Sequence, residues 1–292
     1  MASKKTTKKS VKDPYPKPDH ENWCPGCGNY GIFTAINDAI KILKLKEHEL
    51  LFTYGIGCHG HMVNFHNRNG FEGLHGRAIP VAVGAKLANH KLNTIVISGD
   101  GDCMGEGLNH FVHAARGNQD ITVILHDNRI YGLTTGQTSP TSQKGFRTKS
   151  TPFGVIEKPV NPLMIALSAG ATFVARGFAA NLKQLSELIQ KGVKHKGFSL
   201  IDICQPCVSF NHHNTYEWFN KHTYNLDDIS YDPSDKLKAI DKAKDEEKLG
   251  LGVFYEEKIK SYQEEVPQLS KNILANTSTQ SPSLKYLMDV LR

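Results

Sequence analysis

The chain has 292 residues, of which 39% are hydrophobic and 22% are charged, and it carries a formal net charge of +6 at pH 7. This length is enough to bury one large core or two small ones, and the composition is typical of a soluble globular protein. Residues 1–17 hold six lysines and one acidic residue, so most of the positive charge lies in this segment. The rest of the chain is close to neutral, which argues against a nucleic-acid-binding protein.

In chain order, apolar periodicity predicts helices that alternate with short strands. The predicted elements are a helix over 32–45, a strand over 50–54, a helix over 80–89, a strand over 94–98, a helix over 107–116, a strand over 121–125, a strand over 171–175, a helix over 181–195 and a strand over 198–203. Residues 132–159 show no clear period and are rich in Gly, Thr, Ser and Pro. They predict a long loop, and such loops in compact domains are usually functional.

This alternation predicts an α/β fold with a doubly wound, mainly parallel sheet. We expect a domain over residues 21–230, preceded by a disordered basic arm over 1–20 and followed by a C-terminal extension over 231–292. The arm lacks the apolar segment of a secretory signal, and the longest apolar stretch (163–175) is interrupted and too short to span a bilayer. We therefore expect a cytoplasmic protein, whose six cysteines are thiols or metal ligands rather than disulfides.

Chemically active residue types follow several of the predicted strands. Cys58, Asp100, Asn128 and Cys207 each come just after one of them. Ligands of doubly wound sheets bind beyond the carboxyl ends of the strands, so we expect these residues to meet at one edge of the sheet.

Asp100 and Asn128 are candidate ligands of a magnesium ion. They lie 28 residues apart, the length of one strand–helix–strand crossover. Mg²⁺ prefers oxygen ligands in octahedral geometry and often shares them with phosphates, so a backbone carbonyl just beyond Asn128 and a bound diphosphate would complete the shell. The alternative is an N-cap aspartate and a turn asparagine without a ligand.

The Cys24-Pro-Gly-Cys27 segment is compatible with a zinc site, a redox dithiol or an iron–sulfur cluster. Two cysteines alone do not hold a metal, and the candidate partners are Cys58, Cys204 and Cys207. A zinc site formed by Cys24, Cys27, Cys204 and Cys207 is one alternative.

Histidines gather after Cys58, at positions 59, 61 and 66, and they are either metal ligands or ordinary hydrogen-bonded side chains. His75 and Arg77 flank Gly76 and are candidates to face an anionic ligand.

Taken together, the motifs resemble the β subunits of 2-oxoacid:ferredoxin oxidoreductases. The resemblance covers residues 23–226 and rests on WCPGCG (23–28), YGIGC (54–58), LHGRAIP (74–80), GDGD (99–102), DNRIYGLT (127–134), QPCV (205–208) and NTY (214–216). It implies a sheet of the thiamine-diphosphate-binding type, with thiamine diphosphate, Mg²⁺ and one [4Fe–4S] cluster as cofactors.

The resemblance also implies roles for individual residues. The cluster ligands would be Cys24, Cys27, Cys58 and Cys207, which leaves Cys204 aside, and the Mg²⁺ ligands would be Asp100, Asn128 and the carbonyl of Ile130. The residues against thiamine diphosphate would be Ile56, Gly57, Cys58, His59, His75, Gly76, Arg77, Ala78, Gly101, Asp102, Gly132 and Leu133. His61, His75 and Arg77 are the candidate catalytic residues, and His61 stands where a basic side chain can contact a substrate carboxylate.

The implied reaction is oxidative decarboxylation of a 2-oxoacid with coenzyme A to acyl-CoA and CO₂, or its reverse, with electrons passing through the cluster to ferredoxin. 2-Oxoglutarate is the first expectation for the substrate and pyruvate the second. The activating glutamate would come from an α subunit, with γ and δ subunits as further candidate partners, so we expect this chain to be inactive alone. The alternatives are a non-redox thiamine-dependent decarboxylase and a zinc-stabilised interaction module.

Overall fold

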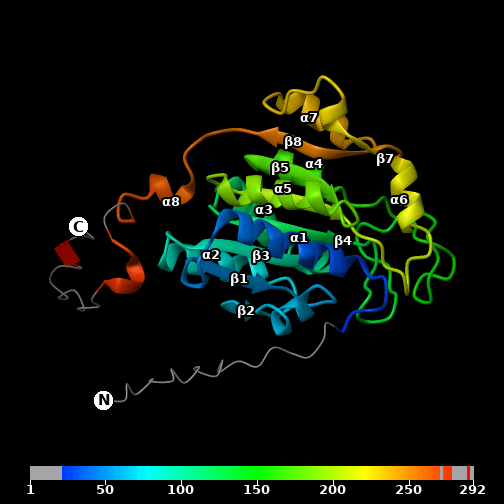
Figure 1. Ribbon diagram of the computed structural model, residues 1–292, viewed down its shortest axis with the longest axis horizontal. Coiled ribbons are helices and arrows are strands. Elements are labelled where there is room, and N and C mark those ends of the chain that lie inside the picture. The colour runs from blue at the N-terminus through cyan, green and yellow to red at the C-terminus, as the bar shows by residue number, and fades with distance from the viewer. Residues whose placement is uncertain (1–21, 270–271, 278–287, 290–292) are drawn as a thin grey trace, which may run out of the picture.

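The computed structural model describes residues 22–269, 272–277 and 288–289, so the predicted basic arm lies outside the described residues. An eight-stranded sheet runs through the molecule in the order β2-β1-β3-β4-β6-β5-β8-β7 (Figure 1). Neighbouring strands are parallel except for the antiparallel pair β5 and β8. The strands are β1 (Leu50–Tyr54), β2 (Gly70–Glu72), β3 (Asn93–Gly99), β4 (Thr122–Asp127), β5 (Phe173–Phe178), β6 (Ser199–Cys204), β7 (Thr223–Asn225) and β8 (Leu249–Glu256).

Helices cover both faces of the sheet, which gives the three layers that a doubly wound fold requires. The helices are α1 (Gly28–Leu43), α2 (Ala78–Ala88), α3 (Leu108–Arg116), α4 (Pro162–Ala169), α5 (Leu182–Lys194), α6 (Tyr216–His222), α7 (Lys236–Ala243) and α8 (Tyr262–Glu265). One apolar core joins α1 and α5 to the sheet, and a second joins α2, α3, α4 and α7 to the other face. The predicted α/β class and mainly parallel sheet are confirmed.

Local sequence explains where several helices begin and end. The side chain of Asn181 accepts a hydrogen bond from the Gln184 amide and caps α5, as the sequence predicts. Helix α1 begins directly after Cys27, four residues earlier than its apolar periodicity indicates, and Lys44 ends it in the left-handed conformation. None of the described helices is long and apolar enough to cross a membrane.

Several features of the sheet and its edge have no counterpart among the predicted elements, and one of them is the short strand β7, which pairs with β8. β2 is a short, exposed strand that pairs with β1, and β8 comes from the part of the chain after residue 230, which therefore contributes to the sheet. A π-helical turn, Gly101–Glu106, directly follows Asp100. The segment from residue 132 to residue 159 contains no helix or strand, as predicted, and lies with α6 at one end of the molecule (Figure 1).

Candidate active site

A cleft lies at the carboxyl ends of β1, β3 and β4, and it holds about 450 Å³ of empty space, open solvent included. It is lined by Ile56, Gly57, Cys58, His59, His75, Gly99, Asp100, Gly101, Asp102, Asn128, Ile130, Tyr131, Gly132, Leu133 and Thr134. The pairing of Gly99 with His126 places the ends of β3 and β4 side by side. Asp100 and Asn128 therefore reach the same cleft from neighbouring strands, as their spacing predicts.

Asp100 is a buried carboxylate that shares a hydroxyl partner with a second carboxylate, Asp127. Its Oδ2 accepts hydrogen bonds from Ser139 Oγ at 2.5 Å and Thr141 Oγ1 at 2.6 Å, and the same Thr141 hydroxyl lies 2.8 Å from Asp127 Oδ1. One hydroxyl hydrogen thus serves two carboxylates. Burial and the charge of Asp127 raise the pKa of Asp100 to about 7. A divalent cation would relieve this excess of negative charge, so the donor set fits Mg²⁺.

The raised pKa of Asp100 predicts a pH dependence for the metal-free chain. Because the folded chain binds this proton more tightly than the unfolded chain does, the free energy of unfolding should fall as the pH rises from about 4 to about 7. Urea midpoints measured with EDTA at about pH 5 and about pH 8 should drop more for the wild-type chain than for Asp100→Asn. An equal drop in both proteins would contradict the assignment.

The side chain of Asp102 contacts three segments that form the cleft: the chain after β1, the chain before α2 and the end of β3. Its Oδ1 accepts hydrogen bonds from the backbone N–H groups of Gly76 at 2.7 Å and Ile56 at 3.1 Å, and lies 2.8 Å from His75 Nδ1. Its Oδ2 accepts from Ser98 Oγ at 2.5 Å. These contacts fix the chain after β1 and before α2 against the turn that follows β3. Asp102 thereby positions the walls of the cleft.

His59 forms part of the floor of the cleft and is neutral near pH 7. Its Nε2 accepts a hydrogen bond from the Gly99 backbone N–H at 3.1 Å, so the proton of the neutral ring is on Nδ1. Burial lowers the pKa of His59 to about 4, although the charge of Asp102 acts in the opposite direction. His59 is thus a buried acceptor for the β3 backbone.

Several predicted site residues lie away from the lining of the cleft. His61 is half-buried beside Asn22, with 3.3 Å between His61 Nδ1 and Asn22 Oδ1. Arg77 is exposed and contacts His110. Gly76 and Ala78 are buried and do not line the cleft. His66 belongs to the core, where its Nδ1 lies 2.8 Å from the hydroxyl of Tyr54.

Four cysteines, which we call the cysteine cluster, gather beside the cleft: Cys24, Cys27, Cys58 and Cys207. Burial, with a smaller contribution from the neighbouring cysteines of the cluster, raises the pKa of Cys27 to about 11 and that of Cys58 to about 12. Such thiols ionise readily only when a metal or cluster balances their charge. Among the described residues, no group of three or more His, Cys, Asp or Glu side chains is arranged to hold a single metal ion.

Cys204 stands apart from the cysteine cluster. It is fully buried, and the charged groups that act on its pKa are Arg176, Asp202, Arg129 and Asp127 rather than other cysteines. Its place at the end of β6 differs from that of Cys207, which lies in the loop beyond. This arrangement does not favour the alternative zinc site that includes Cys204.

Four residues of the site were missed in the sequence: Tyr131, Thr134, Ser139 and Thr141. Tyr131 donates its hydroxyl to the Gly101 carbonyl at 3.1 Å, and Ser139 and Thr141 bind Asp100. The sequence does carry a signal for Ser139 and Thr141, since hydroxyl residues cluster around Pro140 in a long loop of the kind that is usually functional.

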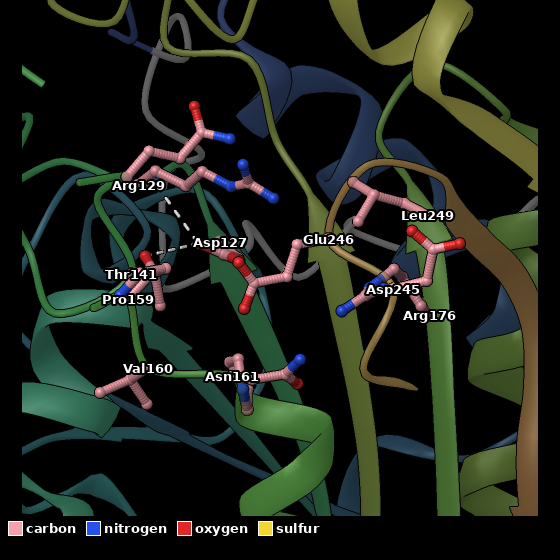
Figure 2. A pocket seen from close by; sticks show the side chains of 12 residues that line it. Asp127, Arg129, Thr141, Pro159, Val160, Asn161, Arg176, Asp245, Glu246 and Leu249 are labelled. Atoms are coloured by element: carbon pink, nitrogen blue, oxygen red, sulfur yellow. Dashed lines mark hydrogen bonds between the residues drawn. The ribbon is translucent and has the colours of Figure 1, made fainter. Parts of the chain in front are cut away.

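A second cleft holds about 400 Å³ of empty space, open solvent included, and Asp127 and Thr141 are among its lining residues (Figure 2). None of the predicted site residues lines it. Asp127 receives hydrogen bonds from Thr141 and from the backbone of Arg129 there. The charged side chains that line it are Asp127, Arg129, Arg176, Asp245 and Glu246. Both signs of charge are present, so the lining does not select an anion or a cation.

Comparison with known proteins places this geometry in a family. Residues 55–203 match the family model described as thiamine pyrophosphate enzyme, C-terminal TPP binding domain, and residues 207–271 match the model for the C-terminal part of the pyruvate ferredoxin oxidoreductase beta subunit. The 2-oxoacid:ferredoxin oxidoreductase subunit beta of Saccharolobus solfataricus is 44% identical over 274 residues, which cover 89% of this chain and 90% of that protein. The chain belongs to the β subunits of 2-oxoacid:ferredoxin oxidoreductases.

Two further relatives carry the 2-oxoglutarate name. The 2-oxoglutarate oxidoreductase subunit KorB of Mycobacterium tuberculosis is 43% identical over 189 residues, 65% of this chain and 51% of that one. A solved 2-oxoglutarate:ferredoxin oxidoreductase from Magnetococcus marinus, with 2-oxoglutarate, coenzyme A and succinyl-CoA bound, has a TM-score of 0.86 and 33% identity, and the match covers 95% of this chain and 94% of that one. The predictions of family, fold class and an oxidoreductase subunit that works with a partner subunit are confirmed. The cleft lies within the residues that match the thiamine-pyrophosphate-binding model.

Proposed function

We propose that this β subunit holds thiamine diphosphate, Mg²⁺ and one [4Fe–4S] cluster, and that with an α subunit in the cytoplasm it oxidatively decarboxylates 2-oxoglutarate. Coenzyme A would take the acyl group and ferredoxin the electrons. The names of the M. tuberculosis and M. marinus relatives favour 2-oxoglutarate over pyruvate. The domain limits proposed from the sequence, 21–230 and 231–292, belong to the same proposal.

The observation that carries this proposal is the position of Gly132. A Cβ atom at this residue would stand 3.5 Å from Sγ of Cys58, 3.6 Å from Sγ of Cys207 and 4.0 Å from Nδ2 of Asn128. The cysteine cluster and the candidate Mg²⁺ ligand Asn128 therefore both lie next to Gly132, which also lines the cleft. Cofactor and cluster would thus be neighbours, as electron transfer between them requires.

The residues of this chain would have two roles: some would bind the metal ion and the cluster, and others would support the walls of the cleft. Asp100, Asn128 and the Ile130 carbonyl would hold Mg²⁺, and Cys24, Cys27, Cys58 and Cys207 would hold the cluster. Thiamine diphosphate supplies, when bound, a ring that accepts the electron pair released by decarboxylation. His59, Asp102 and Tyr131 keep the walls of the cleft in place through buried hydrogen bonds.

None of the glutamates in the part of the chain that the structure describes lines the cleft, and this supports a proton-transfer residue supplied by the α subunit. His75 is the side chain of the wall best placed to face a ligand, because 38% of it is exposed and its Nδ1 lies 2.8 Å from Asp102 Oδ1 at the edge of the cleft. His61 and Arg77 stay candidates for contact with the substrate carboxylate once the α subunit is in place.

The first test is the iron and acid-labile sulfide content of the chain purified without oxygen. We expect about four of each per chain, with a broad brown absorption. The complex with the α subunit should then reduce ferredoxin with 2-oxoglutarate and coenzyme A faster than with pyruvate, and the isolated chain should not. One zinc and no sulfide would overturn the electron-transfer part of the proposal, and faster turnover of pyruvate would overturn the substrate.

A further inference from the structure

A buried polar chain connects the cysteine cluster with the end of β4. Gln205, which is 1% exposed, follows β6, and its Nε2 lies 3.9 Å from Sγ of Cys27 as a hydrogen-bond donor. Its Oε1 lies 3.1 Å from Nδ1 of His126. The side chain of Gln205 therefore bridges a predicted cluster ligand and a residue of the central sheet.

The contacts of His126 agree with the orientation that the Gln205 amide has in the structure. Nδ1 of His126 lies 2.8 Å from Asn29 Oδ1 as well as 3.1 Å from Gln205 Oε1. Both partners are oxygen acceptors, so Nδ1 of His126 carries the hydrogen. With Oε1 held by this N–H, the NH₂ group of Gln205 is directed at Cys27.

The backbone around Gln205 keeps this geometry rigid. The Gln205 N–H donates to the Asp127 carbonyl at 3.0 Å, and the Gly28 N–H donates to the Pro206 carbonyl at 3.2 Å. A Cβ atom at Gly28 would stand only 2.6 Å from Cγ of Gln205, so the Gln205 side chain occupies the space beside the first residue of helix α1, directly after Cys27. Only glycine at position 28 leaves room for this contact.

We propose that Gln205 is a positioning residue that raises the reduction potential of the [4Fe–4S] cluster by donating an N–H···S hydrogen bond to Cys27. This rests on the proposed function, because it requires the cluster. One-electron reduction adds a negative charge that the cysteine sulfurs share, and a hydrogen-bond donor at a sulfur stabilises the reduced state more than the oxidised state. The cluster thereby becomes a better electron acceptor for the reaction in the adjoining cleft.

The test is a redox titration of the cluster, followed by electron paramagnetic resonance, in the complex with the α subunit. Gln205→Leu removes the donor at similar volume, and we expect its midpoint potential to shift to more negative values with iron and sulfide unchanged. Gln205→Glu keeps an oxygen for His126 but places an acceptor beside the sulfur, so its negative shift should be larger. Gln119→Leu is the matched control, because Gln119 is a buried amide that bonds Gln263 at a site away from the cysteines, and its potential should equal that of the wild type.

The outcomes separate this inference from the proposed function. Wild-type potentials in both Gln205 variants, with the cluster retained, would overturn the role of Gln205 and leave the cluster assignment intact. Loss of the cluster from both variants, with a native circular dichroism spectrum, would also overturn it, because Gln205 would then serve assembly rather than potential. Absence of iron and sulfide from the wild-type protein would instead overturn the proposed function.

Discussion

The Asp100→Asn variant should bind thiamine diphosphate about 100-fold more weakly than the wild-type chain in the presence of Mg²⁺, because even outer-sphere changes at a metal site cost 10–100-fold and this change removes a ligand charge. The substitution keeps the shape of the side chain and relieves the repulsion between Asp100 and Asp127. The fold should therefore survive while the site loses its negative charge. Isothermal titration calorimetry with thiamine diphosphate, with and without Mg²⁺, measures the effect.

Asp127→Asn is the matched control for this prediction. Asp127 is also buried and lies 2.8 Å from the hydroxyl of Thr141, but it lines the second cleft rather than the first. Its neutralisation should change the affinity for thiamine diphosphate by less than about threefold, which corresponds to less than about 0.7 kcal/mol. Equal losses in the two variants would mean that the charge of the carboxylate pair, and not ligation by Asp100, governs cofactor binding.

The sequence predicts the parts of the fold that depend on local pattern. Strand β1 has the predicted limits, and Asn181 caps α5 as predicted, because both follow from residues within a few positions of each other. The sequence pattern does not predict strands β2 and β8, and the reason is physical. β2 is held by its pairing with β1 and β8 by its pairing with β5, and such long-range partners leave little trace in a short run of residues.

The residues of the candidate site also differ in whether local sequence pattern can place them. Cys58, Asp100 and Asn128 could be placed together because each follows a strand and parallel strands share one carboxyl edge. Ser139 and Thr141 could not be assigned to Asp100, since the path of the loop that carries them has no periodic signal. The contact of Gln205 with Cys27 joins residues 178 positions apart, and only the folded chain brings them together.

The Cys207→Ala variant should lose the intact [4Fe–4S] cluster, whereas Cys204→Ala should retain it. Both cysteines are buried and lie three residues apart, so the two variants carry the same chemical change at neighbouring positions. They differ in surroundings, because Cys207 interacts with the other cysteines of the cluster and Cys204 with Arg176 and Asp202.

Iron, acid-labile sulfide and the visible spectrum of the anaerobically purified variants distinguish these two cysteines. A cluster with three cysteine ligands lacks a thiolate for its fourth iron, so Cys207→Ala should contain well under four iron atoms per chain and show a weakened brown absorption. Cys204→Ala should match the wild type, with a modest loss of stability from the cavity at the end of β6. The reverse result would move the fourth ligand to Cys204, and it would require the end of β6 to shift away from the buried Arg176–Asp202 ion pair, whose Nε–Oδ2 distance is 2.9 Å. That ion pair is costly to disturb, because separating buried charges leaves each without its partner, and this is the physical reason to expect Cys207 as the ligand.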